Sequence, residues 1–363
     1  MHIKTENCGI GSENQMRYKA KINAAIIVVA ALIIITSCLF FYDKYTSDTV
    51  SDSLEYSSIT DSDASKSISA DISMDISSID EVISDIENSE QTSAIEVVLH
   101  YSEQLDLQLD ASYAIAAYTD GSIIYSKNAL TRCYPASLTK LLTVSTAIRY
   151  IKNDYIFKVG DELDYILEGS SVAGLEKGDK IDFLTLVDAL LVPSGNDAAY
   201  VMAVGIGRLY SENPNMPVNE ALSVFLTLMN QTADDLGCTD SNFANPDGYH
   251  NASHHTTAAD ILKIAIHTNS LDIVKNSINK SKARGVYSNK DVTWINTNLL
   301  LKQEDSHYYQ YATGMKTGAT PEAGKCLAAI AYKNGKEVIT IILDASSDEA
   351  RYKDALTVFN ATL

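Results

Sequence analysis

Hydrophobic and polar residues are distributed unevenly along the 363-residue chain, and the pattern divides it into segments of different kinds. Residues 22–42 are apolar apart from three polar positions, and this run is long enough to cross a bilayer as a helix. Residues 43–94 are dominated by Ser, Asp and Ile and are too polar to bury a core, which predicts a disordered stalk. The composition is globular over 95–363, so we expect one folded domain there, and a cytoplasmic tail over 1–21.

Strand-like segments lie at both ends of the folded domain, and helical spacing fills the middle. A glycine turn predicts a β-hairpin over 112–125, and Asn334-Gly335 predicts a second hairpin over 325–343. Between them, apolar residues recur at helical spacing in four segments: 183–191, 198–209, 219–236 and 257–267. This order predicts an α+β fold, in which one sheet is assembled from both ends of the domain and a helical lobe is inserted between them.

A further helical pattern begins at Pro135 and carries the first candidate for chemistry. Proline suits the first helical position, so Ser137 falls in the first turn and Lys140 follows one turn later on the same face. A serine beside a lysine at the positive end of a helix can become a nucleophile without a histidine. The same Ser-x-x-Lys spacing occurs again at Ser277 and Lys280, so the spacing alone does not identify a nucleophile.

Two other short motifs contain residues able to act with a nucleophilic serine. The first contains Ser194 and Asn196, and by itself it is equally typical of a helix N-cap. The second contains Lys316, Thr317 and Gly318, and by itself it is typical of an edge strand protected by a lysine. Neither motif is specific alone.

In this order, Ser-x-x-Lys, Ser-x-Asn and Lys-Thr-Gly are the signature of penicillin-recognising serine enzymes. Over about residues 105–360 the chain resembles the D-alanyl-D-alanine carboxypeptidases among the low-molecular-mass penicillin-binding proteins. The segments that carry the resemblance are 135–140, 190–199, 228–230, 245–248, 254–260, 296–298 and 314–318. The resemblance implies a β-lactamase/transpeptidase-like fold, with an antiparallel sheet flanked by helices.

The resemblance also implies an acyl-transfer reaction on peptidoglycan stem peptides that end in D-Ala-D-Ala, and acylation by β-lactam antibiotics. Ser137 is expected to be the nucleophile and Lys140 the general base. The base must be neutral, and we expect burial and the charge of Lys316 to lower its pKa. Ser194 is expected to relay a proton to the leaving amine, and Asn196 to bind the substrate amide.

The third motif is expected to bind the terminal part of the substrate. Lys316 and Thr317 suit the terminal carboxylate, and Gly318 leaves room for a peptide along the strand edge. The oxyanion hole is expected to consist of the backbone N–H groups of the nucleophile and of Ala319. Arg351 follows the last strand, and either assistance with the carboxylate or a surface ion pair fits its position.

Charge and composition exclude several other functions. The formal net charge is −19, which argues against nucleic acid and anionic membrane surfaces as partners, although much of the acidity lies in the stalk. No zinc spacing is present among the cysteines and histidines, and we expect no cofactor or metal. His250 and His254 are four residues apart, a spacing that could bind a metal on a helix, but a turn pattern precedes them and no helix pattern spans them, so we expect no metal site there. Cys133, Cys238 and Cys326 are expected to be core residues or free thiols.

The basic residues Arg17, Lys19 and Lys21 precede the apolar run, which predicts an N-terminus inside the cell and a domain tethered outside it at the cell membrane. A lipid-modified Cys38 is the alternative anchor.

The Glu-x-x-x-Asn spacing of a β-lactamase is missing between the second and third motifs. A DD-endopeptidase of the same fold and a non-catalytic penicillin-binding or sensing module remain the alternative functions.

Overall fold

The computed structural model describes residues 96–363 except 152 and 153, all within the unit Thr92–Leu363. The predicted tail, anchor and stalk therefore lie outside the described residues. Within the described part, every helix is too short or too polar to span a membrane.

The strands are β1 (His100–Tyr101), β2 (Tyr113–Tyr118), β3 (Ser122–Lys127), β4 (Ile156–Lys158), β5 (Lys180–Asp182), β6 (Lys282–Tyr287), β7 (Lys290–Ile295), β8 (Ala312–Thr320), β9 (Gly324–Lys333) and β10 (Lys336–Ala345). The α-helices are α3 (Thr139–Ile148), α4 (Phe183–Leu191), α5 (Asn196–Tyr210), α6 (Val218–Asp235), α7 (Ala258–Asn269), α8 (Asp272–Ile278) and α9 (Asp348–Thr362). Short 3-10 turns are η1 (Ala136–Leu138), η2 (Asp161–Tyr165) and η3 (Leu299–Leu301).

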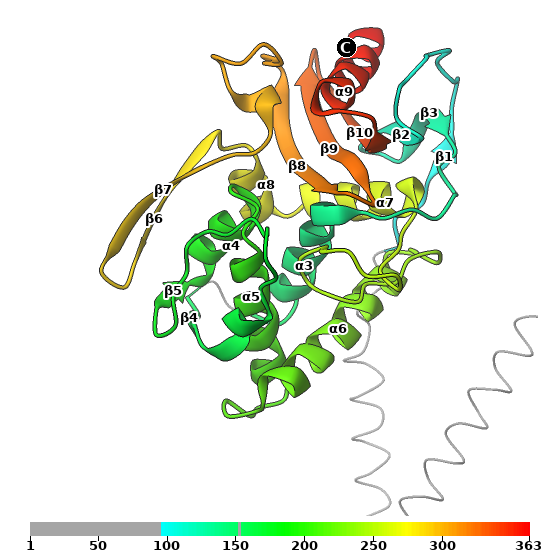
Figure 1. The fold of residues 1–363 in the computed structure, drawn as a ribbon. Helices are drawn as coiled ribbons and strands as arrows, with labels where there is room; N and C mark the ends of the chain where they lie inside the picture. Colours follow the sequence, from blue (N-terminus) through cyan, green and yellow to red (C-terminus); the bar gives the residue numbers. More distant parts are fainter. Residues whose placement is uncertain (1–95, 152–153) are drawn as a thin grey trace, which may run out of the picture. The chain divides into compact units, whose positions relative to one another are not determined.

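The central sheet has the strand order β1-β3-β2-β10-β9-β8, so strands from both ends of the domain lie side by side (Figure 1). Both predicted hairpins are present, as β2–β3 and β9–β10. The expectation of a fully antiparallel sheet is wrong at one edge, because β1 runs parallel to β3. A hairpin forces neighbouring strands to be antiparallel, but β1 reaches the sheet without one, and its direction is not constrained in this way.

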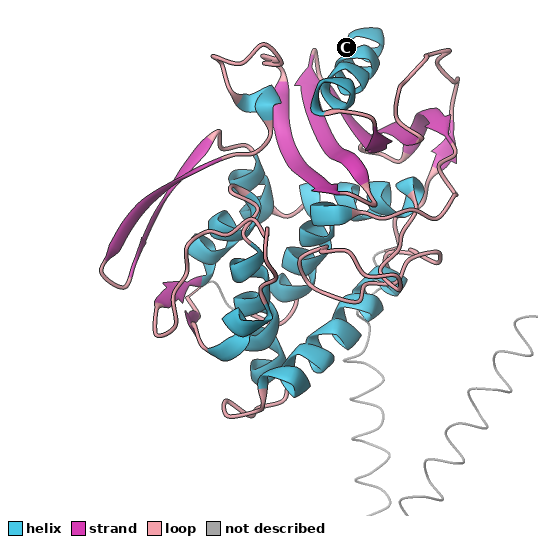
Figure 2. Ribbon diagram, in the orientation of Figure 1, coloured by secondary structure: helices cyan, strands magenta, loops and turns pink. Residues whose placement is uncertain are grey.

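Alternate residues of the strands face two separate cores. On β2, Ile115 and Ala117 belong to the core shared with the helical lobe, whereas Ala114 and Ala116 belong to the core under α9. This two-residue period is what a sheet covered on both faces requires. Figure 2 shows the result, with α9 on one side of the sheet and the larger group of helices on the other.

The helical lobe matches the predicted segments closely. Helix α4 has the predicted bounds, and each end of α5, α6 and α7 differs from its prediction by one or two residues. The helix predicted from Pro135 begins differently, because Ala136 has a positive φ of 48°. Ser137 therefore lies in the 3-10 turn η1, directly before α3, instead of in the first turn of an α-helix.

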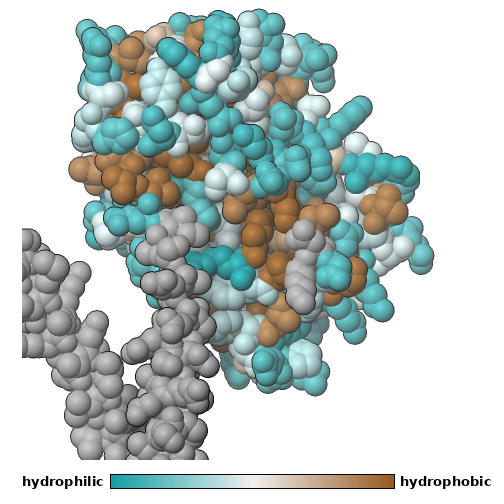
Figure 3. All heavy atoms as spheres, turned by 180° about the vertical axis from the view of Figure 1, so that it is seen from behind, coloured by the Kyte–Doolittle hydropathy of each residue, from teal (hydrophilic) through white to brown (hydrophobic). Residues whose placement is uncertain are grey.

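Strand β8 forms an edge of the sheet, because it pairs only with β9 among the described residues. Its other edge is free to pair with an extended peptide. Seen from behind the view of Figure 1, the surface carries separate hydrophobic patches between hydrophilic side chains (Figure 3).

Candidate active site

One residue of each of the first two motifs, and the residue that follows the third, line one cleft of about 460 Å³. Ser137 comes from η1, Asn196 from the start of α5 and Ala319 from β8. The other lining residues are Glu168, Gly169, Ser170, Ser171, Gly248, Tyr249, His250, Thr320, Pro321 and Glu322. Lys140 and Gly318 do not line the cleft but adjoin Ser137, through the Lys140 amine and beside the Ser137 backbone nitrogen.

Lys140 is completely buried and contacts the predicted nucleophile. Its Nζ lies 3.0 Å from Ser137 Oγ, 2.7 Å from Asn196 Oδ1 and 2.8 Å from the carbonyl oxygen of Asp247. The last two atoms can only accept hydrogen bonds, whereas a hydroxyl can also donate. A neutral amine with two N–H groups would thus donate to Asn196 and Asp247, and its lone pair would face the Ser137 hydroxyl.

Burial lowers the pKa of Lys140 to about 8, and the charges of Asp247 and Asp197 oppose this change. The sequence suggested that the charge of Lys316 also lowers the pKa of Lys140, but Lys316 is not among the causes of this shift. Burial, followed by the charges of Lys140 and Arg351, lowers the pKa of Lys316 well below its usual range. Desolvation alone therefore prepares Lys140 to act as a base.

Hydrogen bonds hold the turn before the nucleophile in place. The Thr139 hydroxyl donates to the Ala136 carbonyl at 2.8 Å and also contacts His254 Nε2 at 2.8 Å. His254 Nδ1 accepts a hydrogen bond from the Ala244 N–H, and burial lowers the pKa of this imidazole to about 3. The neutral ring is therefore a structural link between two loops. Among the residues that the structure describes, no cluster of side chains could hold a metal ion.

Gly248 supports the same turn from the other side. Its φ is +83°, and a Cβ at this position would lie 1.9 Å from the Ala136 carbonyl oxygen. Only glycine allows this close approach. The approach places the adjacent Asp247 carbonyl against Lys140, so the 245–249 turn supplies one of the two acceptors of the base.

In the second motif, the structure separates the two predicted residues. Asn196 bridges the site, because its Oδ1 accepts from Lys140 and its Nδ2 donates to Ser170 Oγ at 3.0 Å. Ser194 is buried with a φ of +65°, and within the described part of the chain its hydroxyl has no hydrogen bond to Ser137 or Lys140. A proton relay through Ser194 needs a rotation of this hydroxyl or movement on substrate binding.

Asp197, which was not predicted as a site residue from the sequence, fixes the wall of the cleft. Its carboxylate accepts the N–H groups of Ala173, Gly174 and Leu175 at 2.8, 2.8 and 3.0 Å. These bonds hold the 168–175 loop over the second motif, and this loop supplies Ser170 to Asn196. An Asp directly after the Ser-x-Asn motif was the available signal, but it also suits the first turn of any helix.

The third motif lies on β8 beneath the nucleophile. A Cβ on Gly318 would be 2.9 Å from the Ser137 backbone nitrogen, so this glycine keeps the Ser137 N–H open and is not needed only for the strand edge. Ala319 is exposed in the cleft. Thr317 Oγ1 lies 2.6 Å from Thr297 Oγ1, and buried Lys316 donates to the Thr317 carbonyl at 2.9 Å.

Arg351 does not line the cleft, and it is not at the surface. It is 8% exposed, and its Nη1 donates to the carbonyl oxygens of Gly318 and Cys326, both at 3.1 Å. An ion pair with Asp348 at 2.7 Å holds the guanidinium in place. Arg351 therefore supports β8 from behind, and the predicted ion pair is present but with a buried guanidinium instead of one at the surface.

The three cysteines of the described domain are free thiols. Cys133 is the one nearest in sequence to the nucleophile, but burial raises its pKa to about 12. Cys238 and Cys326 are buried as well, and burial raises the pKa of both. These thiols are too weakly acidic to provide a nucleophile near neutral pH.

The second Ser-x-x-Lys copy does not line the cleft, and its side chains bind a residue of another helix. Ser277 Oγ and Lys280 Nζ both bind the Asp188 carboxylate of α4, at 2.7 Å and at 2.7 and 2.8 Å. The Ser277 side chain is buried between α8 and α4, so this copy contributes to the packing of two helices.

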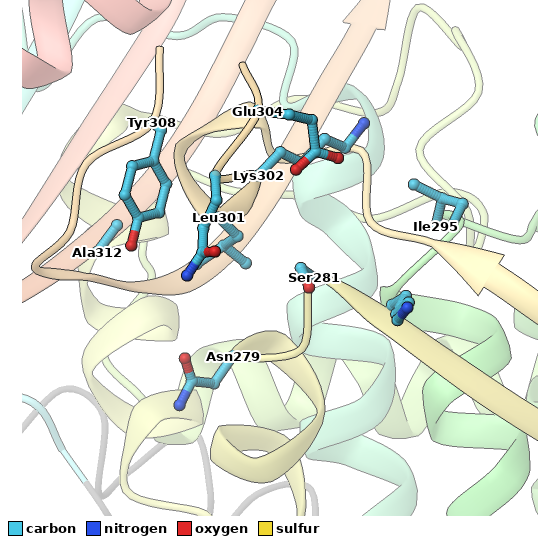
Figure 4. Close-up of a pocket in the computed structure, with 10 residues that line it drawn as sticks. Asn279, Ser281, Ile295, Leu301, Lys302, Glu304, Tyr308 and Ala312 are labelled. Carbon is cyan, nitrogen blue, oxygen red and sulfur yellow. The ribbon is translucent and has the colours of Figure 1, made fainter. Parts of the chain in front are cut away.

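A separate cavity of about 450 Å³ lies at the start of β8 and contains none of the predicted site residues (Figure 4). It is lined by Asn279, Ser281, Lys282, Ile295, Leu301, Lys302, Gln303, Glu304, Tyr308 and Ala312.

Residues 100–347 match the family model described as D-alanyl-D-alanine carboxypeptidase. The chain belongs to this family. A D-alanyl-D-alanine carboxypeptidase of Streptomyces sp. (strain K15) is 33% identical over 258 residues, which are 66% of this chain and 82% of that protein. The D-alanyl-D-alanine carboxypeptidase DacF of Bacillus subtilis (strain 168) is 28% identical over 258 residues, 68% of this chain and 60% of its own length.

The crystal structure of the Streptomyces K15 DD-transpeptidase superposes with a TM-score of 0.64 and 29% identity, covering 70% of this chain and 98% of that one. The predicted fold class is confirmed by this likeness, with the sheet mixed at its β1 edge. The D-alanyl-D-alanine carboxypeptidase family consists of serine-type peptidases, and the predicted enzyme class and function are confirmed at this level.

Proposed function

We propose that the domain removes the terminal D-alanine from peptidoglycan stem peptides through an acyl-enzyme on Ser137, and that penicillins acylate the same serine. The observation that carries this proposal is the 3.0 Å contact between Lys140 Nζ and Ser137 Oγ, in a buried site with two carbonyl acceptors for the amine. This arrangement is what a neutral lysine base requires.

In the first half-reaction, the Lys140 amine accepts the Ser137 proton while Oγ attacks the carbonyl carbon of the penultimate D-alanine. The oxyanion is bound by the N–H groups of Ser137 and Ala319, which both line the cleft. The C–N bond breaks and the leaving amine takes a proton, for which we retain Ser194 as the relay. Water then hydrolyses the ester, with Lys140 again as the base.

Thr317 and Lys316 are proposed to bind the terminal carboxylate of the substrate. Lys316 makes one hydrogen bond among the described residues, to the Thr317 carbonyl, so its amine has unused donors. Its pKa is lowered by burial in the free enzyme. An incoming carboxylate would raise this pKa and restore the charge, because an opposite charge favours the ammonium form.

D-Alanine release from a synthetic stem pentapeptide, followed by mass spectrometry, tests the proposal. We expect a tetrapeptide product and covalent labelling by a fluorescent penicillin. A DD-endopeptidase would instead cut a cross-linked dimer and leave the pentapeptide intact. A sensing module would bind penicillin without releasing D-alanine. Either of these two results would overturn the proposal.

We also propose that residues 22–42 tether the domain to the outer face of the cell membrane. The support is the uninterrupted apolar run with basic residues before it. In intact spheroplasts, external protease should remove the domain from the membrane fraction. Its protection from external protease, or its release by alkaline carbonate, would contradict this tether. Incorporation of labelled palmitate that is lost in a Cys38→Ala variant would instead indicate lipid attachment.

A further inference from the structure

One end of the catalytic cleft carries two carboxylates and no strong cation. We call it the acyl end, and its residues are Glu168, Tyr249, His250, Thr320, Pro321 and Glu322. Among the described residues that line the whole cleft, Glu168 and Glu322 are the acidic ones, and neither Lys nor Arg is present. Lys140 and Lys316 are buried and do not line the cleft, and the Lys140 amine adjoins it through Ser137 and Asn196.

The direction of a bound peptide follows from the roles proposed above, so this inference rests on the proposed function. The scissile carbonyl lies at Ala319, and the terminal carboxylate lies at Lys316 and Thr317, nearer to the start of β8. The substrate must then run antiparallel to β8. An extended chain advances about 3.3 Å per residue, so the residue before the acyl D-alanine lies beside Thr320 and the turn that follows.

Glu322 is held at the wall of this end. It lies in the turn between β8 and β9, its side chain is 43% exposed, and its Oε2 is 3.7 Å from His250 Nδ1. The His250 Nδ1 atom is buried without a hydrogen-bond partner among the described residues, and its ring packs edge-on against Tyr134. The Glu322 carboxylate thus faces a fixed imidazole and keeps free acceptor positions towards the cleft.

Glu168 forms the opposite part of the same rim. The Tyr249 hydroxyl donates to the Glu168 carbonyl oxygen at 3.4 Å, and His250 follows Tyr249 directly in the chain. The 168–171 loop and the β8–β9 turn are therefore connected through the 249–250 segment. Both acidic residues line the cleft at this end, where the side chain of the preceding substrate residue would emerge.

We propose that Glu322, together with Glu168, binds an amino group on the side chain of the residue before the acyl D-alanine. An ammonium group forms a charge-assisted hydrogen bond with a carboxylate, and acylation of that amine removes its charge. The cleft therefore selects stem peptides whose side-chain amine is free over peptides in which it is acylated, as in a cross-link. Lys316 at one end and the acidic rim at the other complement a substrate that carries opposite charges at its two ends.

The test compares two synthetic tripeptides, Nα-acetyl-L-Lys-D-Ala-D-Ala and the same peptide with an acetylated side-chain amine. D-Alanine release by the wild-type enzyme should have a kcat/KM about fivefold higher for the free amine, as expected for a partly exposed ion pair. Added salt should reduce this ratio, because it screens exposed charges. Equal kcat/KM values for the two peptides would overturn the inference and leave the proposed function standing.

Two substitutions assign the selectivity to Glu322. In Glu322→Gln the ratio should fall towards one, and in Glu322→Lys the preferred peptide should become one with a succinylated side-chain amine. Glu304→Gln is the matched control, because Glu304 lies in the separate cavity of Figure 4. Covalent labelling by fluorescent penicillin shows that each variant is folded. Retention of the wild-type ratio in Glu322→Gln would overturn the inference, whereas failure of the wild type to release D-alanine from either peptide would overturn the proposed function and the inference with it.

Discussion

The two Ser-x-x-Lys copies have the same spacing and opposite surroundings. Lys140 is completely buried, and its partners besides Ser137 are the uncharged acceptors of Asn196 and Asp247. Lys280 is partly exposed, and both it and Ser277 bind the Asp188 carboxylate. Burial with uncharged acceptors as its hydrogen-bond partners favours the free amine of Lys140. The comparison shows that the partners of the lysine, more than the spacing of the motif, decide whether it can act as a base.

The most severe test of the comparison removes each hydroxyl in turn. Ser137→Ala should abolish covalent labelling by fluorescent penicillin and D-alanine release, because the ester has no other site to form. Ser277→Ala should retain both. Peptide mapping of the labelled wild type should place the adduct on the segment that contains Ser137. An adduct on the wild-type segment that contains Ser277, or any labelling of Ser137→Ala, would contradict the comparison.

The next largest effect is expected when each lysine becomes an arginine. A guanidinium does not lose its proton, so Lys140→Arg should lower the acylation rate by about a thousandfold, within the range of general base catalysis. Lys280→Arg should keep the ion pair with Asp188 and stay within about twofold of the wild-type rate. Stopped-flow acylation with a chromogenic β-lactam measures both, and thermal unfolding reports whether the buried arginine is tolerated. Equal rates in folded Lys140→Arg and wild type would exclude Lys140 as the base.

The first copy also depends on a neighbour that the second copy lacks. Gly318→Ala would place a methyl group 2.9 Å from the Ser137 backbone nitrogen and obstruct the oxyanion hole. We expect kcat to fall about a hundredfold, as on loss of one oxyanion donor. Gly335→Ala is the control for lost stability alone, because Gly335 has open space around it but a φ of +79°, at which alanine is strained. An unchanged kcat in Gly318→Ala would contradict the assigned oxyanion hole.

The smallest expected effect concerns the stability role of the second copy. Asp188→Asn removes the charge that Ser277 and Lys280 bind, and Lys280 is partly exposed. The free energy of unfolding should fall by about 1 kcal/mol, and Tm by about 2–4 °C. Calorimetry measures the shift, and penicillin labelling should persist. An unchanged Tm together with lost labelling would show that this contact serves the cleft instead of the packing of α8.

The sequence predicted the elements whose apolar spacing is strong. Helices α4, α6 and α7 and the hairpins β2–β3 and β9–β10 lie where the pattern placed them. The hairpin β6–β7 was missed, because its exposed positions include the apolar Val286 and Ile295, so its apolar residues do not alternate cleanly between two faces. Helix α9 was missed as well, since charged and hydroxyl residues interrupt its buried stripe.

The sequence also identified the reacting side chains, because each belongs to a motif with fixed spacing. It did not identify the Asp247 carbonyl as a partner of Lys140, because a backbone acceptor has no residue signature. A lone serine such as Ser170, and the position of Arg351 behind β8, could not be read from spacing either. These contacts depend on segments that only the fold brings together.

The central claim is that Lys140 acts as a neutral base beside Ser137, and the pH dependence of the acylation rate tests it most directly. Because the base acts without its proton, the rate should rise with pH, about tenfold per unit well below the pKa. It should level off above a midpoint near the Lys140 pKa of about 8. Stopped-flow acylation by a chromogenic β-lactam between about pH 6 and 10 measures the profile. A rate that is flat across this range, or that falls as pH rises, would contradict the account.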